Sequence, residues 1–110
     1  TANISFEDFQ KVDMRVGTII EVNDFPKARV PAFQLKIDFG TLGIKKSSAQ
    51  ITALYAKEAL INKIVFAVIN FEVKQIANFK SECLVLGIQK GKDVVLLHPA
   101  AAVANGTQVL

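Results

Sequence analysis

Residues 33–39 read FQLKIDF and alternate between apolar and polar side chains along the whole segment. Successive side chains of a β-strand point to opposite faces, so this period of two predicts a strand with one face in a core and the other in water. The composition agrees with a sheet protein, because Val and Ile supply 23 of the 110 residues and Phe another 8. Such β-branched and aromatic side chains pack well on pleated surfaces.

Four other segments are predicted to be strands. Residues 14–22 also alternate, so the even-numbered residues should face one way and the odd-numbered residues the other. Residues 64–71 form a nearly continuous apolar run, which is typical of a strand buried on both sides. Residues 82–88 and 94–97 are predicted as further strands, separated by a tight turn at Gly91.

Two helices are predicted among these strands. Ser5 precedes an apolar stripe at helical spacing, formed by Phe6, Phe9 and Val12, and is placed to cap a short helix. Residues 52–60 are mostly good helix formers, and Thr52 is placed to cap a second helix.

The order of the elements predicts a fold. A helix is followed by three strands, of which residues 44–51 are polar for a strand, and then by a helix, two strands, an extra strand and a tail. A helix between the third and fourth strands of a closed five-stranded sheet is the layout of an OB-fold, a Greek-key barrel. We therefore predict one all-β domain over residues 1–110 with a C-terminal extension. An open α+β sheet with both helices on one face is the alternative.

Few residues have the chemistry of a catalytic or metal site. His98 is the only histidine, and no Ser or Cys motif accompanies it. Cys83 begins an apolar strand, where a small buried side chain is expected, and one His with one Cys is too few for a structural zinc site. The glycines fit no phosphate-binding loop. We predict no enzyme activity, no metal and no cofactor. A small hydrolase built on Cys83 and His98 is the alternative to a protein without enzyme activity.

Basic residues and phenylalanines coincide in two loops of the predicted barrel. The ligand face of an OB-fold is flanked by the loop after strand one and the loop between strands four and five, here residues 25–31 and 72–81. Phenylalanine rings at this mouth would stack on bases. The alternative for each residue is a solvated rim lysine or a loop anchor. The predicted RNA- or peptide-binding residues are Phe25, Lys27, Arg29, Lys36, Lys45, Lys46, Lys74, Gln75, Asn78, Phe79, Lys80 and Ser81.

Charge and hydropathy bear on the ligand class and on the cellular location of the protein. The net charge of +3 is too small to diagnose nucleic-acid binding alone, but residues 41–110 carry eight bases and four acids, whereas residues 1–40 carry five and six. Residues 1–11 lack the basic-then-apolar order of a signal peptide, and the longest apolar run, residues 64–69, is too short to span a bilayer. We expect a cytoplasmic protein.

Seven short and different sequence motifs are spread along the chain. They are VDMRVGTI at residues 12–19, FPKARVPA at 25–32, IDFG at 37–40, SSAQIT at 47–52, NF at 70–71, FKSE at 79–82 and NGT at 105–107. Together they resemble the tRNA-binding domain appended to many methionyl-tRNA synthetases, and more closely the stand-alone, CsaA-like members of that family. The resemblance extends from about Phe6 to Thr107.

The resemblance implies an OB-fold homodimer that acts as a chaperone for exported preproteins, with unfolded polypeptide, the export machinery and tRNA as partners. It places the dimer contacts in residues 1–13 and 95–110. Apolar side chains there have no place inside a small barrel, so burial between two copies is expected, with packing on their own barrel as the alternative. The predicted interface residues are Phe6, Phe9, Val12, Val103, Val109 and Leu110. A protein that mainly binds the shape and backbone of tRNA is the alternative function.

The chain departs from the synthetase-type pattern near Ser81. Residues 72–78 carry fewer basic residues than that pattern, and Asn78 still tolerates the left-handed backbone conformation that a glycine would adopt there. Cys83 and Leu84 replace a Gly-Met pair. Each lost phosphate contact lowers RNA affinity, so these departures weaken the tRNA hypothesis and leave the peptide hypothesis untouched.

Overall fold

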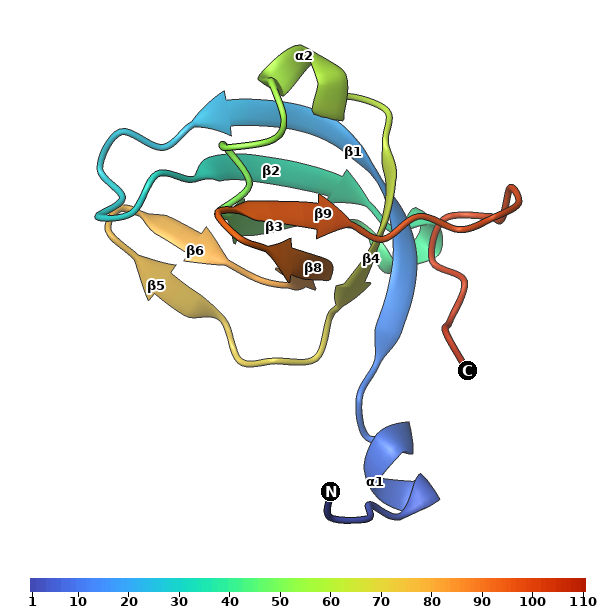
Figure 1. Ribbon diagram of the computed structural model, residues 1–110. Helices are drawn as coiled ribbons and strands as arrows, with labels where there is room; N and C mark the ends of the chain where they lie inside the picture. Colours follow the sequence, from blue (N-terminus) through green and yellow to red (C-terminus); the bar gives the residue numbers. More distant parts are fainter.

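The computed structural model describes residues 1–110 as a small antiparallel barrel with an arm at one end (Figure 1). The main sheet has five strands in the order β3-β2-β1-β4-β7. They are β1 (Met14–Asp24), β2 (Phe33–Asp38), β3 (Ile44–Ala49), β4 (Ile64–Val68) and β7 (Leu84–Val85). Helix α1 (Phe6–Gln10) precedes the sheet, a 3-10 turn η1 (Gly40–Leu42) follows β2, and helix α2 (Lys57–Leu60) lies between β3 and β4. The predicted five-stranded OB-type barrel is therefore confirmed.

Inward-facing side chains of the strands fill the barrel. Leu35, Ile37 and Phe39 are fully buried, as the alternation of residues 33–39 predicts. Strand β1 departs from simple alternation, because Ile19 is fully buried and Val22, three residues later, packs against the same core, whereas Ile20 is 41% exposed. A β-bulge between Ile19 and Glu21 shifts the pairing with β2, so the inward face of β1 changes from odd-numbered to even-numbered residues along the strand.

Single hydrogen bonds rather than a regular ladder close the barrel between β3 and β7. The Ser47 hydroxyl donates to the Cys83 carbonyl at 2.8 Å, and the Glu82 N–H donates to the Lys46 carbonyl at 2.7 Å. The Glu82 carboxylate in turn accepts a hydrogen bond from the Lys46 N–H at 2.9 Å. The chain that leads into β7 is thereby fixed against β3.

Two predicted segments are shorter than expected. Thr52 begins no helix: residues 52–54 form turns, and α2 begins only at Lys57. Only the turn that ends at the buried Leu60 is helical, so tertiary packing rather than the helix propensity of residues 52–60 sets the extent of α2. Strand β4 ends at Val68, and Phe71 is 59% exposed rather than buried. The cause is the partner strand, since β1 begins at Met14, which pairs with Val68.

Two hairpins complete the fold. Residues 72–81, expected as a loop, contain a hairpin of β5 (Lys74–Ile76) and β6 (Phe79–Ser81). Its turn places Ala77 at a positive φ of 50°, so the left-handed position of the turn falls on Ala77 and not on Asn78. The second hairpin joins β8 (Gly87–Lys90) to β9 (Asp93–Leu96) through Gly91 at φ 60°, which confirms the predicted turn.

The arm and the tail lie outside the barrel (Figure 1). Ser5 caps α1 as predicted, since its Oγ accepts a hydrogen bond from the Asp8 N–H at 3.1 Å. The tail returns along β1, where the Val16 N–H donates to the Thr107 carbonyl at 3.0 Å and the Gly106 N–H donates to the Val16 carbonyl at 2.7 Å. None of the helices is both long and apolar enough to cross a membrane.

Candidate functional site

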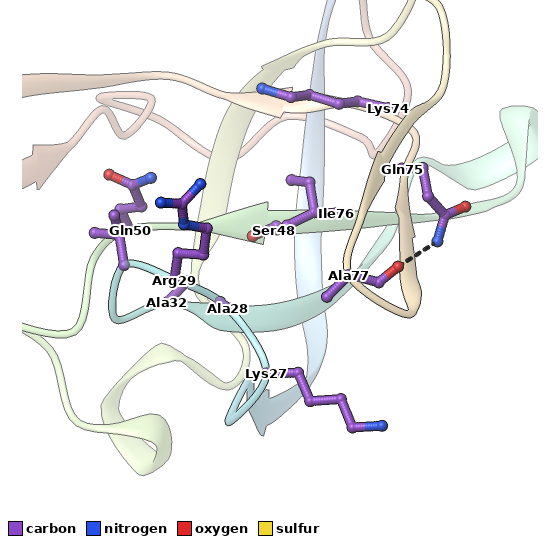
Figure 2. Close-up of a pocket in the computed structure, with 11 residues that line it drawn as sticks. Lys27, Ala28, Arg29, Ala32, Ser48, Gln50, Lys74, Gln75, Ile76 and Ala77 are labelled. Carbon is purple, nitrogen blue, oxygen red and sulfur yellow. Dashed lines mark hydrogen bonds between the residues drawn. The ribbon is translucent and has the colours of Figure 1, made fainter.

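A pocket of about 470 Å³ opens between the β1–β2 loop and the β5–β6 hairpin (Figure 2). The loop contributes Lys27 and Arg29, strand β5 contributes Lys74, and no carboxylate lines the pocket. Ser48 and Gln50, at the end of β3, lie between the two. The two connections that the sequence singled out therefore meet. We call this the basic pocket, lined by residues 27–30, Ala32, Ser48, Gln50 and residues 74–77.

A small apolar cluster holds these two connections together. Phe25, Ala32 and Phe79 are buried, and Ala28 and Ile76 pack against them. Only 4% of Phe25 and 9% of Phe79 is exposed, so neither ring has a free face for a base. The expected stacking role of these rings is therefore wrong, and their contact orders the pocket walls instead. The contact between the two rings also removes their apolar surface from water beneath the basic pocket.

The hairpin divides its polar residues between two faces. Lys74 pairs with Ser81, and Gln75 pairs with Lys80, so alternation puts Lys74 and Ser81 on one face and Gln75 and Lys80 on the other. Lys74 lines the basic pocket, whereas Lys80 does not. Gln75 lies at the outer rim, where its amide donates to the Ala77 carbonyl at 2.9 Å (Figure 2). The two loops carry four basic residues, and only three of them, Lys27, Arg29 and Lys74, line the basic pocket.

The lysines of β2 and β3 do not join the basic pocket. Lys36 pairs across the sheet with Lys46, and its ammonium lies 3.4 Å from the carboxylate of Glu21. The Lys46 ammonium lies 5.2 Å from the centroid of the Phe79 ring. Lys45 alternates with Lys46 and therefore faces the opposite side of β3, on the inward face. These three side chains are engaged with neighbours or directed elsewhere.

Two further compartments adjoin the basic pocket. The apolar compartment, about 310 Å³, shares Ser48, Gln50, Lys74 and Ile76 with the basic pocket. The acidic compartment, about 430 Å³, shares Ser81, Cys83 and Leu84 with the apolar compartment, and Lys74 borders all three. The apolar compartment is lined by residues 48–51, Lys74, Ile76, Ser81, residues 83–85, Val94 and Leu96. The acidic compartment is lined by residues 71–72, Lys74 and residues 81–84.

Sequence reasoning missed most of this apolar wall. Val94 and Leu96 belong to the extra strand after the barrel, and Leu84 stands in a strand predicted for the core. No local pattern identifies which face of such a strand borders a groove. Phe71 is predicted to lie in a buried strand, but in the structure it lines the acidic compartment. Ser81 was identified as a site residue, and its hydroxyl also accepts a hydrogen bond from the Ser48 N–H at 3.1 Å, which fixes β6 beside β3.

Cys83 and His98 lie in different surroundings. Burial raises the pKa of the Cys83 thiol to about 11, so the thiol is protonated at neutral pH and a poor nucleophile. His98 borders a separate depression lined by residues 62–64 and 98–102, and its Nδ1 donates to the Ile64 carbonyl at 2.6 Å. The Cys–His pair that the hydrolase hypothesis requires is not formed.

The arm and the end of the tail border an apolar cleft of about 270 Å³. Phe6, Phe9 and Val12 contribute from the arm, and Val109 and Leu110 contribute from the tail. Phe6 is 72% exposed, and its ring centroid lies 6.3 Å from that of Phe9. Five of the six residues expected at a dimer interface are thus gathered in one place. Val103, the sixth, is exposed and lies outside this cleft.

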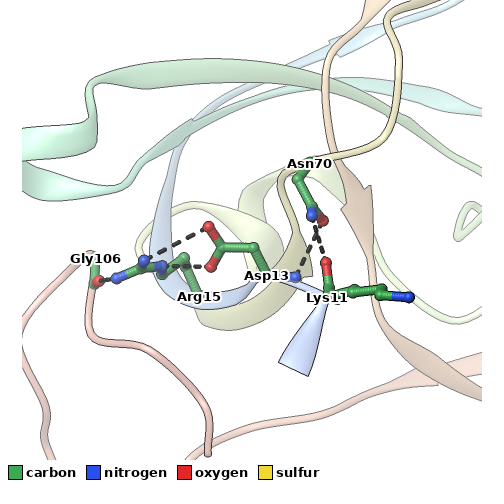
Figure 3. A network of polar contacts seen from close by, with 5 residues as sticks. All are labelled: Lys11, Asp13, Arg15, Asn70 and Gly106. Carbon is green, nitrogen blue, oxygen red and sulfur yellow. Dashed lines mark hydrogen bonds and ion pairs between the residues drawn. The ribbon is translucent and has the colours of Figure 1, made fainter. Parts of the chain in front are cut away.

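A polar network joins the arm, the start of β1, the segment after β4 and the tail (Figure 3). The Arg15 guanidinium lies 2.6 Å from the Asp13 carboxylate through Nε and donates to the Gly106 carbonyl at 3.1 Å through Nη1. The Asn70 side chain accepts a hydrogen bond from the Asp13 N–H at 3.0 Å and donates to the Lys11 carbonyl at 2.6 Å. Residues from three of the motifs listed above meet here, so these motifs fix the arm and the tail to the barrel.

Comparison with a family of known domains agrees with this architecture. Residues 14–108 match the family described as "Putative tRNA binding domain". The methionine–tRNA ligase of Pyrococcus horikoshii is 38% identical over 106 residues, which are 96% of this chain and 14% of that protein. The chain thus spans about a seventh of the curated relatives' length.

Solved structures match over the whole length. The crystal structure of chaperone CsaA from Bacillus anthracis superimposes with a TM-score of 0.93 at 51% identity, covering 99% of this chain and 100% of that one. The CsaA chaperone protein from Picrophilus torridus also gives a TM-score of 0.93, at 52% identity, with 98% and 100% of the two chains covered. The chain is therefore similar over its whole length to chains described as CsaA chaperones, and to one part of a methionine–tRNA ligase.

Proposed function

Because the chain belongs to the tRNA-binding domain family, we propose that it is a non-catalytic binding module rather than an enzyme. In this proposal residues 1–110 act as one unit, which holds unfolded segments of exported preproteins in the groove formed by the basic, apolar and acidic compartments. The full-length similarity to proteins described as CsaA chaperones supports this function over that of a synthetase part. We expect the protein to act in the cytoplasm, where preproteins occur before export.

The single observation that carries the proposal is the groove itself. Its central compartment is lined mostly by apolar residues such as Ile76, Val94 and Leu96, and the adjoining basic pocket supplies Arg29 and Lys74 at the rim. An apolar wall with charged groups at its edges suits unfolded polypeptide, whose apolar side chains leave water on binding.

We propose that the protein is a homodimer formed through residues 1–13 and 95–110. Helix α1 has five residues, too few for stability without tertiary contacts, and its Phe6 and Phe9 border an apolar cleft away from the barrel. A second copy seated on this cleft would bury the exposed rings in a two-fold contact.

Transfer RNA is the second candidate ligand. The three basic groups that line the basic pocket without any carboxylate favour it, because phosphate binding depends on such uncompensated charge. The site residues that we retain for either ligand are Lys27, Arg29, Lys74 and Gln75, with Asn78 in the turn of the adjoining hairpin.

A titration of the purified protein with tRNA and with a reduced, alkylated polypeptide tests the proposal. Binding of the polypeptide should change little between low and moderate salt, whereas tRNA binding should fall steeply. Competition by apolar peptides should displace the polypeptide. Tight tRNA binding without any polypeptide binding would instead assign the groove to tRNA.

A further inference from the structure

The groove changes its electrical character from one end to the other. Glu72 and Glu82 line the acidic compartment and outnumber Lys74, its one basic residue, whereas Lys74 is the single charged residue of the apolar compartment. The basic pocket at the far end adds Lys27 and Arg29 and has no carboxylate. The compartments share walls, so a ligand that occupies all three meets negative, apolar and positive surroundings in succession.

We infer that the groove takes an extended polypeptide segment with a cationic side chain at one end, apolar side chains in the middle and an anionic group at the other end. This inference rests on the proposed function and specifies its ligand. Opposite charges at the two ends of a site give specificity and orientation more than raw affinity.

The acidic compartment is built to take the cationic side chain. Glu72 forms none of the ion pairs of the chain, so its carboxylate is free to receive a charge. Phe71 and Leu84, which are 59% and 48% exposed, stand beside it as apolar surface. A Lys or Arg side chain packs its aliphatic stem on such a surface while its charged group reaches a carboxylate.

A nucleic-acid strand complements this groove less well. Every nucleotide carries a negative phosphate, so a strand that follows the groove would bring phosphates to Glu72 and Glu82 at the acidic end. A polypeptide carries both signs of charge and apolar side chains, and it therefore matches all three compartments.

Fluorescence anisotropy with three labelled peptides tests the inference. The peptides share one run of Leu and Val and differ at their ends, which are Arg and Asp, two Arg, or two Asp. The Arg/Asp peptide should bind about two- to fivefold more tightly than the other two, as expected for one added exposed charge pair. The Glu72→Lys variant should lose affinity for the Arg/Asp peptide by a similar factor and gain affinity for the Asp/Asp peptide.

Glu58→Lys is the matched control, because Glu58 lies on α2 and lines none of the three compartments. This variant has the same net charge as Glu72→Lys and should keep the preference of the parent protein. Equal affinities for the three peptides, or a preference that Glu72→Lys leaves unchanged, would overturn the inference while peptide binding itself still supports the proposed function. Absence of binding by every peptide and by an unfolded polypeptide would overturn both.

Discussion

The ring of Phe79 lies 5.4 Å from the ring of Phe25, centroid to centroid, at an interplanar angle of 59°. This tilted contact joins β6 to the β1–β2 loop, two segments that are far apart in the sequence. Both rings are buried, and the Lys46 ammonium lies over the Phe79 ring. The shape of the basic pocket therefore depends on an aromatic contact beneath it rather than on the charged residues that line it.

Replacement of Phe79 by Ala should separate the two walls of the basic pocket. The lost apolar burial and the remaining cavity should lower the free energy of unfolding by about 3 kcal/mol, measured by urea denaturation. Ligand affinity should fall as well, although Phe79 lines none of the three compartments. Phe79→Leu keeps most of the apolar volume and serves as the control, with a loss below about 1.5 kcal/mol. Wild-type stability in Phe79→Ala would show that the contact does not order the loops.

Lys74 and Lys80 provide a matched pair on opposite faces of one hairpin. Lys74→Glu should weaken tRNA binding strongly and lower the slope of log affinity against log salt concentration by about 1, because one phosphate contact is lost. Lys80→Glu makes the same change in net charge at a residue that does not line the basic pocket, and should have a smaller effect. Filter binding at several salt concentrations measures both. Equal losses would indicate a diffuse electrostatic attraction with no role for the pocket.

The periodic parts of the sequence predicted the barrel well. Residues 33–39 alternate because one face of β2 is buried, and that face is the core in the structure. The bulge after Ile19 left no such signal, because Ile19 and Ile20 are both apolar and the residue pattern does not show which of them faces the core. The extent of β4 was likewise set by its partner strand, because pairing ends where β1 begins at Met14.

The candidate site was predictable only in part. Positive charge in two loops identified Arg29 and Lys74, because the OB topology brings those loops together. The roles of Phe25 and Phe79 were not predictable from their loop positions. Whether each ring is buried depends on the tertiary contacts that the other ring, Ala32 and their neighbours make with it. The division between Lys74 and Lys80 required the hairpin register, which the sequence did not reveal because residues 72–81 lack a standard turn signal.

The double variant Phe6→Ser, Phe9→Ser tests the dimer. Sedimentation analysis of the parent protein should give twice the chain mass of 12.0 kDa, and the variant should give the chain mass. The barrel should remain folded, because α1 contributes no buried residue to it. Ile88→Ser is the control, since Ile88 is also exposed, at 58%, but lies on β8 away from the arm. A dimer that survives the double substitution would place the interface elsewhere.

A substitution at Gly106 tests whether the close approach of the tail to the barrel holds the tail against β1. Its φ is 88°, and a Cβ atom there would overlap the carbonyl oxygen of Phe39. Gly106→Ala should therefore release the tail from β1 and expose the Val16 amide, which donates to Thr107. Hydrogen exchange at Val16 should become at least about tenfold faster. Gly43→Ala is the control, because φ there is also positive but a Cβ atom would meet nothing within 4 Å. Unchanged exchange would mean that other contacts hold the tail.

Burial of Cys83 predicts a loss of stability at alkaline pH. The folded protein raises the pKa of this thiol to about 11, above the value of about 8.5 expected in the unfolded chain. The neutral thiol is therefore favoured on folding, so its contribution is complete below about pH 8.5 and is lost as the pH rises toward 11. The difference in unfolding free energy between the parent protein and Cys83→Ala should change by up to about 3 kcal/mol over that interval. The comparison removes the effect of lysines that titrate in the same range. Rapid alkylation of the native thiol at pH 8 would contradict its burial, because only the thiolate reacts.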